Sequence, residues 1–177
     1  MAKHTIESGQ APQHEILFDF PLHSEILPNL WLGGTNDNDT ISEAQNEFDE
    51  RSITKKDFDL VVTLYAWAQP VDWFVREIRY GFFDAGVDEF RDSFTVMFNI
   101  AADAHRAWKQ GDRVLVRCQA GINRSGLIVA LVLMKEGYSA EDAIALMRAK
   151  RSEYVLINKS FESLLLTIDK IGGIHAV

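Results

Sequence analysis

The chain has 177 residues, 47% hydrophobic and 25% charged, which fits one ordinary globular domain and excludes a disordered protein. A net charge of −8 gives no overall positive field, so the sequence predicts neither a nucleic-acid partner nor a membrane partner. The single cysteine excludes an internal disulfide and a cysteine-built zinc site, and it fits a reducing compartment. Without a signal-peptide pattern or an apolar run near the ~20 residues that cross a bilayer, we expect a cytoplasmic protein.

The N-terminal part of the chain divides into a tail and the start of a structured domain. Residues 1–13 are predicted to be a flexible tail, because they are polar and lack periodicity, and residues 14–177 to form one domain. Ile26–Gly33 is predicted to be a short strand that ends at glycines. Thr40 and Glu43 have the spacing of a capping box, which predicts a helix that continues to about Arg51.

The rest of the chain alternates between strand and helix patterns. Asp59–Leu64 is continuously apolar, which is typical of a strand covered on both faces. Apolar patterns predict further strands at 75–83 and 114–116 and helices that begin near Ser93, Leu127, Ser139 and Asn158. This alternation indicates an α/β fold: a single domain with a central, largely parallel (mixed) sheet of four or five strands flanked by helices.

The residues that carry chemistry lie between the strand at 114–116 and the helix that follows. A tight strand-to-helix loop directs several backbone N–H groups inward, and the helix N-terminus adds its dipole, so a phosphate dianion fits there. Gly121 supplies the unusual backbone angles that such a loop needs. The predicted phosphate-binding residues are Gln119, Ala120, Gly121, Ile122, Asn123 and Arg124.

Three side chains of this segment have separate predicted roles. Cys118 lies near a helix N-terminus and near cations, which favours an exposed, readily oxidised thiolate that can act as a nucleophile. Arg124 offers a planar guanidinium that can grip two phosphate oxygens. Ser125 can donate its hydroxyl to the sulfur and help the thiolate to leave.

The pattern Cys-x5-Arg-Ser resembles the signature of the protein tyrosine phosphatase superfamily, and the surrounding sequence resembles its compact dual-specificity branch. The similarity spans about residues 26–170, with Ile157-Asn158 resembling the start of the closing helix. It implies a cysteine-phosphatase fold and a catalytic domain at 14–177. The family usually has histidine directly before the cysteine, where it helps to organise the loop and to tune the thiol. This chain has Arg117 there, which puts the rate and the pH optimum in question.

The resemblance also implies a general acid on a loop some thirty residues before the cysteine. Asp84 follows the predicted strand at 75–83 and is the best match, with Asp88 as the alternative. Trp67 and Trp73 lie in a loop that either borders the pocket or is packed into the core. A further basic cluster of Arg148, Lys150 and Arg151 is predicted to be a solvated helix end.

The resemblance implies hydrolysis of phosphomonoesters through a cysteinyl-phosphate intermediate, with no metal and no cofactor. The expected partner is a phosphorylated protein or a small phosphomonoester. Uncharged loop side chains favour phosphotyrosine, phosphoserine or phosphothreonine over phosphoinositides; these residues are Gln119, Ala120, Ile122 and Asn123. The sequence does not set the oligomeric state.

Three alternatives stand beside this prediction. A non-catalytic phosphate-binding module of the same fold is favoured by Arg117 and by the ambiguity of the acid. An arsenate reductase is disfavoured because the chain has no second cysteine to resolve the oxidised state. A sulfurtransferase is disfavoured by Arg124 and Ser125 at these offsets, which suit phosphoryl transfer.

Overall fold

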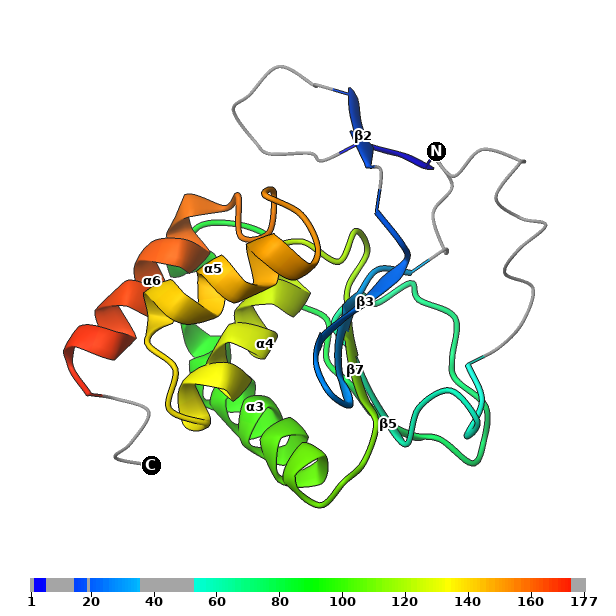
Figure 1. Ribbon diagram of the computed structural model, residues 1–177. Helices are drawn as coiled ribbons and strands as arrows, with labels where there is room; N and C mark the ends of the chain where they lie inside the picture. The colour runs from blue at the N-terminus through cyan, green and yellow to red at the C-terminus, as the bar shows by residue number, and fades with distance from the viewer. Residues whose placement is uncertain (1, 6–14, 19, 36–52, 173–177) are drawn as a thin grey trace.

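The computed structural model describes residues 2–5, 15–18, 20–35 and 53–172. Its main body is a sheet with a layer of helices on one face and loops on the other (Figure 1). The strands are β1 (Ala2–Thr5), β2 (Glu15–Phe18), β3 (His23–Leu27), β4 (Leu30–Gly33), β5 (Leu60–Thr63), β6 (Arg76–Arg79) and β7 (Val114–Arg117). The helices are α2 (Val87–Phe90), α3 (Phe94–Lys109), α4 (Arg124–Lys135), α5 (Ala140–Lys150) and α6 (Lys159–Lys170), with a 3-10 turn, η1 (Arg91–Ser93), before α3.

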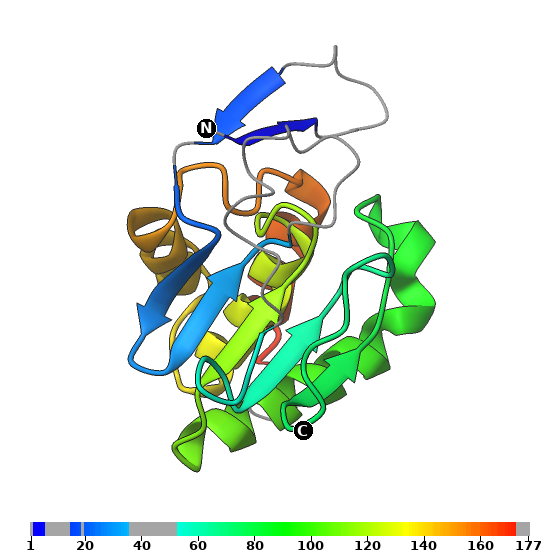
Figure 2. The same cartoon turned by 90° about the vertical axis from the view of Figure 1, so that its right-hand side faces the viewer.

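The central sheet has five strands in the order β3-β4-β7-β5-β6, which lie side by side in Figure 2. The pairs β4–β7, β7–β5 and β5–β6 are parallel, and only β3–β4 is antiparallel. The predicted α/β fold with a largely parallel, mixed sheet is therefore confirmed. Parallel strands end at one edge of the sheet, so the loops after β5, β6 and β7 meet there.

The predicted single strand at Ile26–Gly33 is wrong, because the chain reverses direction inside it. His23–Leu27 and Leu30–Gly33 form an antiparallel hairpin. At the turn Asn29 has φ 67°, a left-handed conformation that asparagine tolerates better than most residues, and its backbone N–H donates to Glu25 Oε1. The predicted strand at 75–83 is shortened to β6, because the chain leaves the sheet after Arg79.

Two predictions fall at the edge of the described residues or beyond it. Ala2–Thr5, part of the predicted flexible tail, instead pairs antiparallel with Glu15–Phe18 in a separate two-stranded sheet. The helix predicted from Thr40 to Arg51 lies outside the described residues, and the division of the chain at residue 13 stays a prediction.

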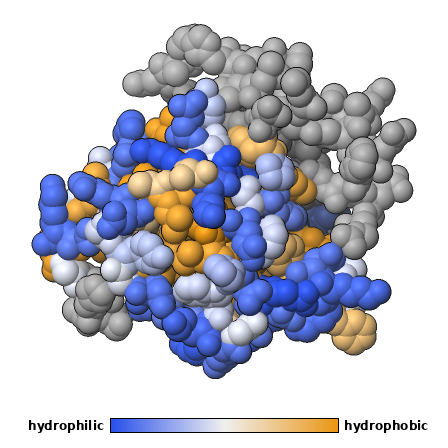
Figure 3. Space-filling model, in the orientation of Figure 1, coloured by the Kyte–Doolittle hydropathy of each residue, from blue (hydrophilic) through white to orange (hydrophobic). Residues whose placement is uncertain are grey.

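The main core lies between the sheet and the helices. Leu60 and Val62 of β5 face this core, whereas Val61 joins a smaller cluster with Phe58 and Leu115 on the opposite face. This alternation explains why Leu60, Val61 and Val62 are all apolar. On the face drawn in Figure 3, hydrophobic side chains gather in the middle of the helical layer and hydrophilic ones surround them.

Helix α4 lies at the centre of the helical layer and packs on α3, α5 and α6. Every residue from Ser125 to Met134 is buried, which confirms the prediction of a helix in the middle of the core. The helix starts predicted near Ser139 and Asn158 are also confirmed, and both side chains cap their helices: Ser139 accepts from Asp142 N at the start of α5, and Asn158 accepts from Ser160 N at the start of α6. These caps fix the helices that support the loop before α4.

Candidate active site

The loop 118–123 joins the end of β7 to the first residue of α4, as predicted, and it contains all the predicted phosphate-binding residues before Arg124. Its first residue is tied to the neighbouring strand, because Cys118 N donates to Gly33 O at 3.2 Å. The backbone N–H groups of residues 120–123 donate no hydrogen bond to the described part of the chain. The loop therefore retains several donors that can bind an anion.

Gly121 is the position at which this loop needs glycine. Its φ of 70° is left-handed, and a Cβ at this position would lie 2.5 Å from the carbonyl carbon of Gly33 and 2.5 Å from Arg151 Nη2. The first neighbour is backbone and cannot move aside easily. A side chain here would therefore push the loop away from β4.

The predicted nucleophile lies at the floor of the loop. Cys118 Sγ is 3.1 Å from Ser125 Oγ, so the predicted contact between sulfur and hydroxyl is present. The prediction of an exposed thiol is wrong, because Cys118 is only 2% exposed. Both Cys118 and Ser125 belong to the buried core, since they lie between β7 and the first turn of α4. An approaching group must therefore enter the loop to meet the sulfur.

Arg124 is the first residue of α4 and is held by two loops from elsewhere in the chain. Its Nη1 donates to the carbonyls of Leu64 and Phe82, each at 3.3 Å, and its guanidinium lies over the Tyr65 ring at 5.4 Å. Its Nε is buried and has no hydrogen-bond partner among the described residues. The guanidinium is thus held in place while retaining a donor for a phosphate oxygen.

Asp84 lies beside the same loop, although 34 residues separate it from Cys118 in sequence. Its Oδ2 accepts from Asn123 Nδ2 at 2.9 Å, and its Oδ1 accepts from Asn158 Nδ2 at 2.8 Å. Asn158 N also donates to Asn123 Oδ1 at 3.0 Å, so the three side chains form one network. Sequence reasoning assigned no role to Asn158 beyond the start of a helix, but here it connects Asp84 to the loop.

The alternative acid, Asp88, lies in α2 and forms an exposed ion pair with Arg91 at 2.9 Å. It makes no hydrogen bond to the loop 118–123. The packed alternative for the two tryptophans is wrong: Trp67 is 78% exposed and Trp73 is 97% exposed. Trp67 follows Tyr65 in the loop beside Arg124, whereas Trp73 precedes β6 and so lies toward the opposite edge of the sheet.

Arg117, in the position where the family usually has histidine, is buried and reaches across the sheet. Its Nε donates to Thr63 Oγ1 at 3.0 Å, and its Nη2 donates to Gln69 O at 2.6 Å. Nη2 also lies 3.4 Å from Glu77 Oε1 in an ion pair. The substitution therefore connects β7 to β5, β6 and the loop after β5.

Arg151 contacts the loop 118–123, which sequence reasoning did not predict. The predicted solvated helix end is wrong for this residue, which is 8% exposed. Its Nε donates to Gly121 O at 2.7 Å and its Nη2 donates to Ala120 O at 3.3 Å, both in the loop 118–123, which we call the phosphate loop. Further bonds to the β3–β4 region end on Pro21 O, Ser24 Oγ and Leu32 O. No local pattern signals these contacts, because the partners lie 30 to 130 residues away.

Burial lowers the pKa of Arg151 to about 10, and the negative charge of Cys118 opposes this shift. Arg151 thus remains protonated at neutral pH. Burial, followed by the charges of Arg151 and Arg117, lowers the pKa of His23 to about 4. His23 is distant from the loop in sequence, but β3 brings it into the field of both arginines, where its ring is neutral at neutral pH.

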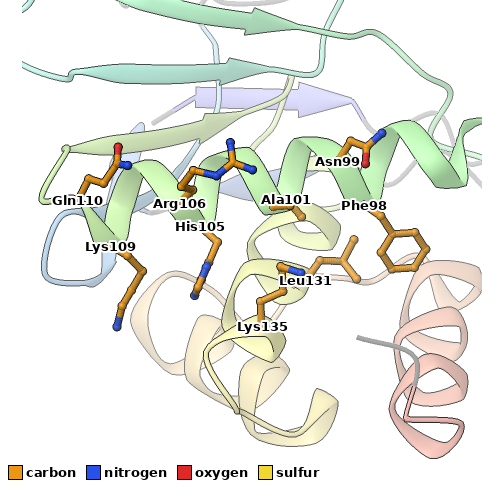
Figure 4. A pocket seen from close by; sticks show the side chains of 10 residues that line it. Phe98, Asn99, Ala101, His105, Arg106, Lys109, Gln110, Leu131 and Lys135 are labelled. Carbon is orange, nitrogen blue, oxygen red and sulfur yellow. The ribbon is translucent and has the colours of Figure 1, made fainter. Parts of the chain in front are cut away.

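A groove of about 560 Å³ lies away from this loop, between α3 and α4 (Figure 4). Its cations have acidic neighbours: Glu136 pairs with His105 and Lys109, and Arg106 pairs with Asp103. The described residues include no cluster of three or more side chains suited to hold a metal. No helix in the described part of the chain is long and apolar enough to cross a membrane.

A strand-to-helix loop with this cysteine, arginine and serine defines the class of cysteine-based phosphatases. Comparison with known proteins identifies the family. The model of the dual specificity phosphatase catalytic domain matches residues 41–171, which is most of the chain. The chain therefore belongs to the dual specificity phosphatase family.

The relatives agree with this assignment. Protein 123R of Invertebrate iridescent virus 6, whose name places it with the tyrosine phosphatases, is 34% identical over 65 residues, or 36% of this chain. That match spans 46% of the viral protein, less than half of its length. Human DUSP28 has a TM-score of 0.64 at 21% identity, over 85% of this chain and 95% of DUSP28. A mouse protein described as a dual specificity phosphatase, complexed with zinc tungstate, has a TM-score of 0.65 at 23% identity, over 96% of this chain and 94% of its own.

Proposed function

We propose that this protein hydrolyses phosphomonoesters without a metal, with Cys118 as nucleophile and Asp84 as general acid. The observation that carries the proposal is the 2.9 Å hydrogen bond between Asp84 and Asn123, because it connects an acid from a distant loop to the loop that holds the cysteine. The Cys118–Ser125 contact and the held guanidinium of Arg124 support it.

In the first step, Cys118 Sγ attacks phosphorus in line and the bond from phosphorus to the leaving oxygen breaks. Arg124 and the loop amides stabilise the equatorial oxygens, and the Asp84 carboxylic acid gives its proton to the leaving oxygen. In the second step, the Asp84 carboxylate takes a proton from water, whose oxygen attacks phosphorus. The S–P bond breaks, and the Ser125 hydroxyl stabilises the departing thiolate.

We propose that the substrate is a protein phosphorylated on tyrosine, serine or threonine. A small phosphomonoester is the alternative. The phosphate loop carries no lysine that would bind the further phosphates of an inositol lipid. Relative kcat/KM for phosphotyrosine, phosphothreonine and phosphoinositide substrates tests this choice. Preference for the phosphoinositide would contradict it.

The test of the mechanism is hydrolysis of a chromogenic aryl phosphate across pH 5–8 in the presence of a chelator. Cys118→Ser should abolish turnover. Asp84→Asn should lower kcat by roughly 100-fold, the usual contribution of general acid catalysis. Asp88→Asn is the matched control, since Asp88 is an exposed acid four residues further along the chain, and should leave kcat unchanged.

Two results would overturn the proposal. Activity that survives in Cys118→Ser would exclude the cysteine mechanism. A wild-type protein that binds tungstate but does not turn over would instead establish the non-catalytic phosphate-binding module.

A further inference from the structure

A partly buried charged cluster lies on β5, β6 and β7, beside the loop 118–123. Glu77 Oε1 accepts from Thr63 Oγ1 at 2.6 Å and from Arg79 Nη2 at 3.0 Å, and it lies 3.4 Å from Arg117 Nη2. Thr63 Oγ1 in turn accepts from Arg117 Nε at 3.0 Å. We call these four residues the Glu77 cluster.

Both arginines of the Glu77 cluster bind the backbone of one loop, residues 64–69. Arg79 Nη1 donates to Ala68 O at 2.8 Å and to Ala66 O at 3.4 Å, and its Nη2 donates to Gln69 O at 3.3 Å. Arg117 Nη2 donates to Gln69 O at 2.6 Å. The end of the loop farthest from β5 is therefore held by two guanidinium groups.

The beginning of the same loop holds Arg124. Leu64 N donates to Arg117 O at 2.8 Å, and Leu64 O accepts from Arg124 Nη1 at 3.3 Å. The ring of Tyr65, the next residue, lies under the Arg124 guanidinium. The Glu77 cluster and Arg124 are thus connected by one short loop, fixed at both ends.

The burial of Arg117 and Glu77 indicates that the cluster fixes the positions of the groups it contacts. The Arg117 and Glu77 side chains are 7% and 17% exposed, and an ion pair this far from water is rarely more stabilising than packed apolar residues. Such pairs are well suited to select one arrangement of the groups they contact. Here those groups are the backbone carbonyls of a single loop beside the phosphate site.

We propose that the Glu77 cluster positions Arg124 by fixing loop 64–69, a role that rests on the proposed phosphatase function. Arg117 is the residue directly before Cys118, and its side chain reaches the loop that holds Arg124. It thereby couples Cys118, its neighbour in sequence, to Arg124. Glu77 offsets one of the two positive charges in the cluster, and its contacts with Thr63 and both arginines fix their positions.

The decisive variant is Glu77→Gln, which keeps the side chain's size and removes the charge that holds both arginines. Displacing a group that grips the transition state costs roughly ten- to 100-fold in rate. We expect kcat/KM for an aryl phosphate to fall by that factor and tungstate to bind about tenfold more weakly, measured by calorimetry well below the melting temperature. Arg76→Gln is the control, since Arg76 is on the same strand but pairs with Asp112 at an exposed site and should change neither value.

The outcomes separate this proposal from the proposed function. If the wild type turns over and folded Glu77→Gln has unchanged kcat/KM and tungstate affinity, the positioning role is wrong. If the wild type does not turn over, the proposed function fails, but tungstate affinity still decides the positioning role. If Glu77→Gln does not fold, Arg79→Lys decides: it should weaken tungstate binding, because lysine cannot reach the three carbonyls at once, and unchanged binding would overturn the proposal.

Discussion

Two buried arginines flank the phosphate loop, and they are held in different ways. Arg151 lies behind the loop, and its hydrogen bonds to the described residues all end on neutral oxygens. Arg117 is the last residue of β7, directly before the loop, and both it and Arg79 pair with the Glu77 carboxylate. Among the described residues, Arg151 therefore has no carboxylate partner, whereas Arg117 is paired.

This difference indicates that Arg151 affects the phosphate loop through its charge, whereas Arg117 affects it through its contacts. Arg151 is electrostatically coupled to Cys118, because the charge of Cys118 raises the pKa of Arg151. Arg117 acts through its contacts with a loop. His23, near both, responds more to Arg151 than to Arg117 in the lowering of its pKa. The same substitution at the two arginines should therefore give different results.

The largest effect is expected for Arg151→Met. It leaves the carbonyls of Gly121 and Ala120 without their donor, so kcat/KM should fall by roughly 100-fold or more. The unfolding free energy should fall by about 3 kcal/mol, since several buried polar groups lose their partners. The acidic limb of the pH–rate profile should move to higher pH, because the thiolate loses a cation. An acidic limb that stays in place would contradict the electrostatic role.

His23→Gln tests whether burial and the charges of Arg151 and Arg117 lower the pKa of His23, and the readout is the free energy of unfolding. In the wild type the pKa of His23 is about 4 when folded and 6.5 when unfolded, so only the unfolded state takes up this proton between those values. The unfolding free energy should decline as the pH falls from 6.5 toward 4, by at most about 3 kcal/mol. Urea unfolding at several pH values measures this slope, which should vanish in His23→Gln.

Asp59 does not obscure this window, and Glu136 and Glu162, whose pKa values are lowered from 4.5, affect only its acidic end. The hydrogen bond from Arg113 holds the pKa of Asp59 well below its usual 3.8, so the stability it provides is present above that value and is lost only as the pH falls further. An equal slope in the wild type and in His23→Gln would mean that another group titrates between pH 6.5 and 4.

Arg117→Met should have a smaller effect than Arg151→Met and leave the acidic limb unmoved. Glu77 keeps Arg79 and Thr63 as partners, so the loss of stability should be about 2 kcal/mol. The loop loses one of its two guanidinium contacts, and we expect kcat/KM to fall roughly tenfold. A shift of the acidic limb as large as in Arg151→Met would remove the distinction between the two arginines.

The smallest effect is expected for Ser24→Ala, which removes one hydrogen bond from Arg151 and leaves its charge. The unfolding free energy should fall by about 1 kcal/mol, with kcat/KM and the acidic limb unchanged. Chemical denaturation measures the unfolding free energy, and the pH–rate profile gives kcat/KM and the acidic limb. A change in rate would show that β3 controls the phosphate loop more directly than the contacts indicate.

The elements predicted correctly are those whose signals are local. Three features depend on residues within a few positions: the loop from Cys118 to Arg124, the fully buried helix after it, and the helix starts at Ser139 and Asn158. The hairpin at Asn29 also had a local signal, because Pro-Asn is a turn pair, but the apolar residues on both sides outweighed it.

The residues that sequence reasoning could not place act over long separations. Arg151 looks like any cation in the last turn of a helix until the fold brings it to carbonyls 30 to 130 residues away. The partners of Arg117 lie 40 to 54 residues away, on other strands. The choice between Asp84 and Asp88 depended in the same way on a partner, Asn123, that is 39 residues from Asp84.

The burial of α4 has a consequence for how the protein opens. Because ten consecutive residues of this helix are buried, from Ser125 to Met134, it cannot detach without exposing most of the core. Its amide protons should exchange with deuterium only through global unfolding, and proteases should find no cleavage site there in the native state. The helix that begins at Arg124 would then belong to the most slowly exchanging part of the molecule, while exposed segments such as that around Trp73 exchange early.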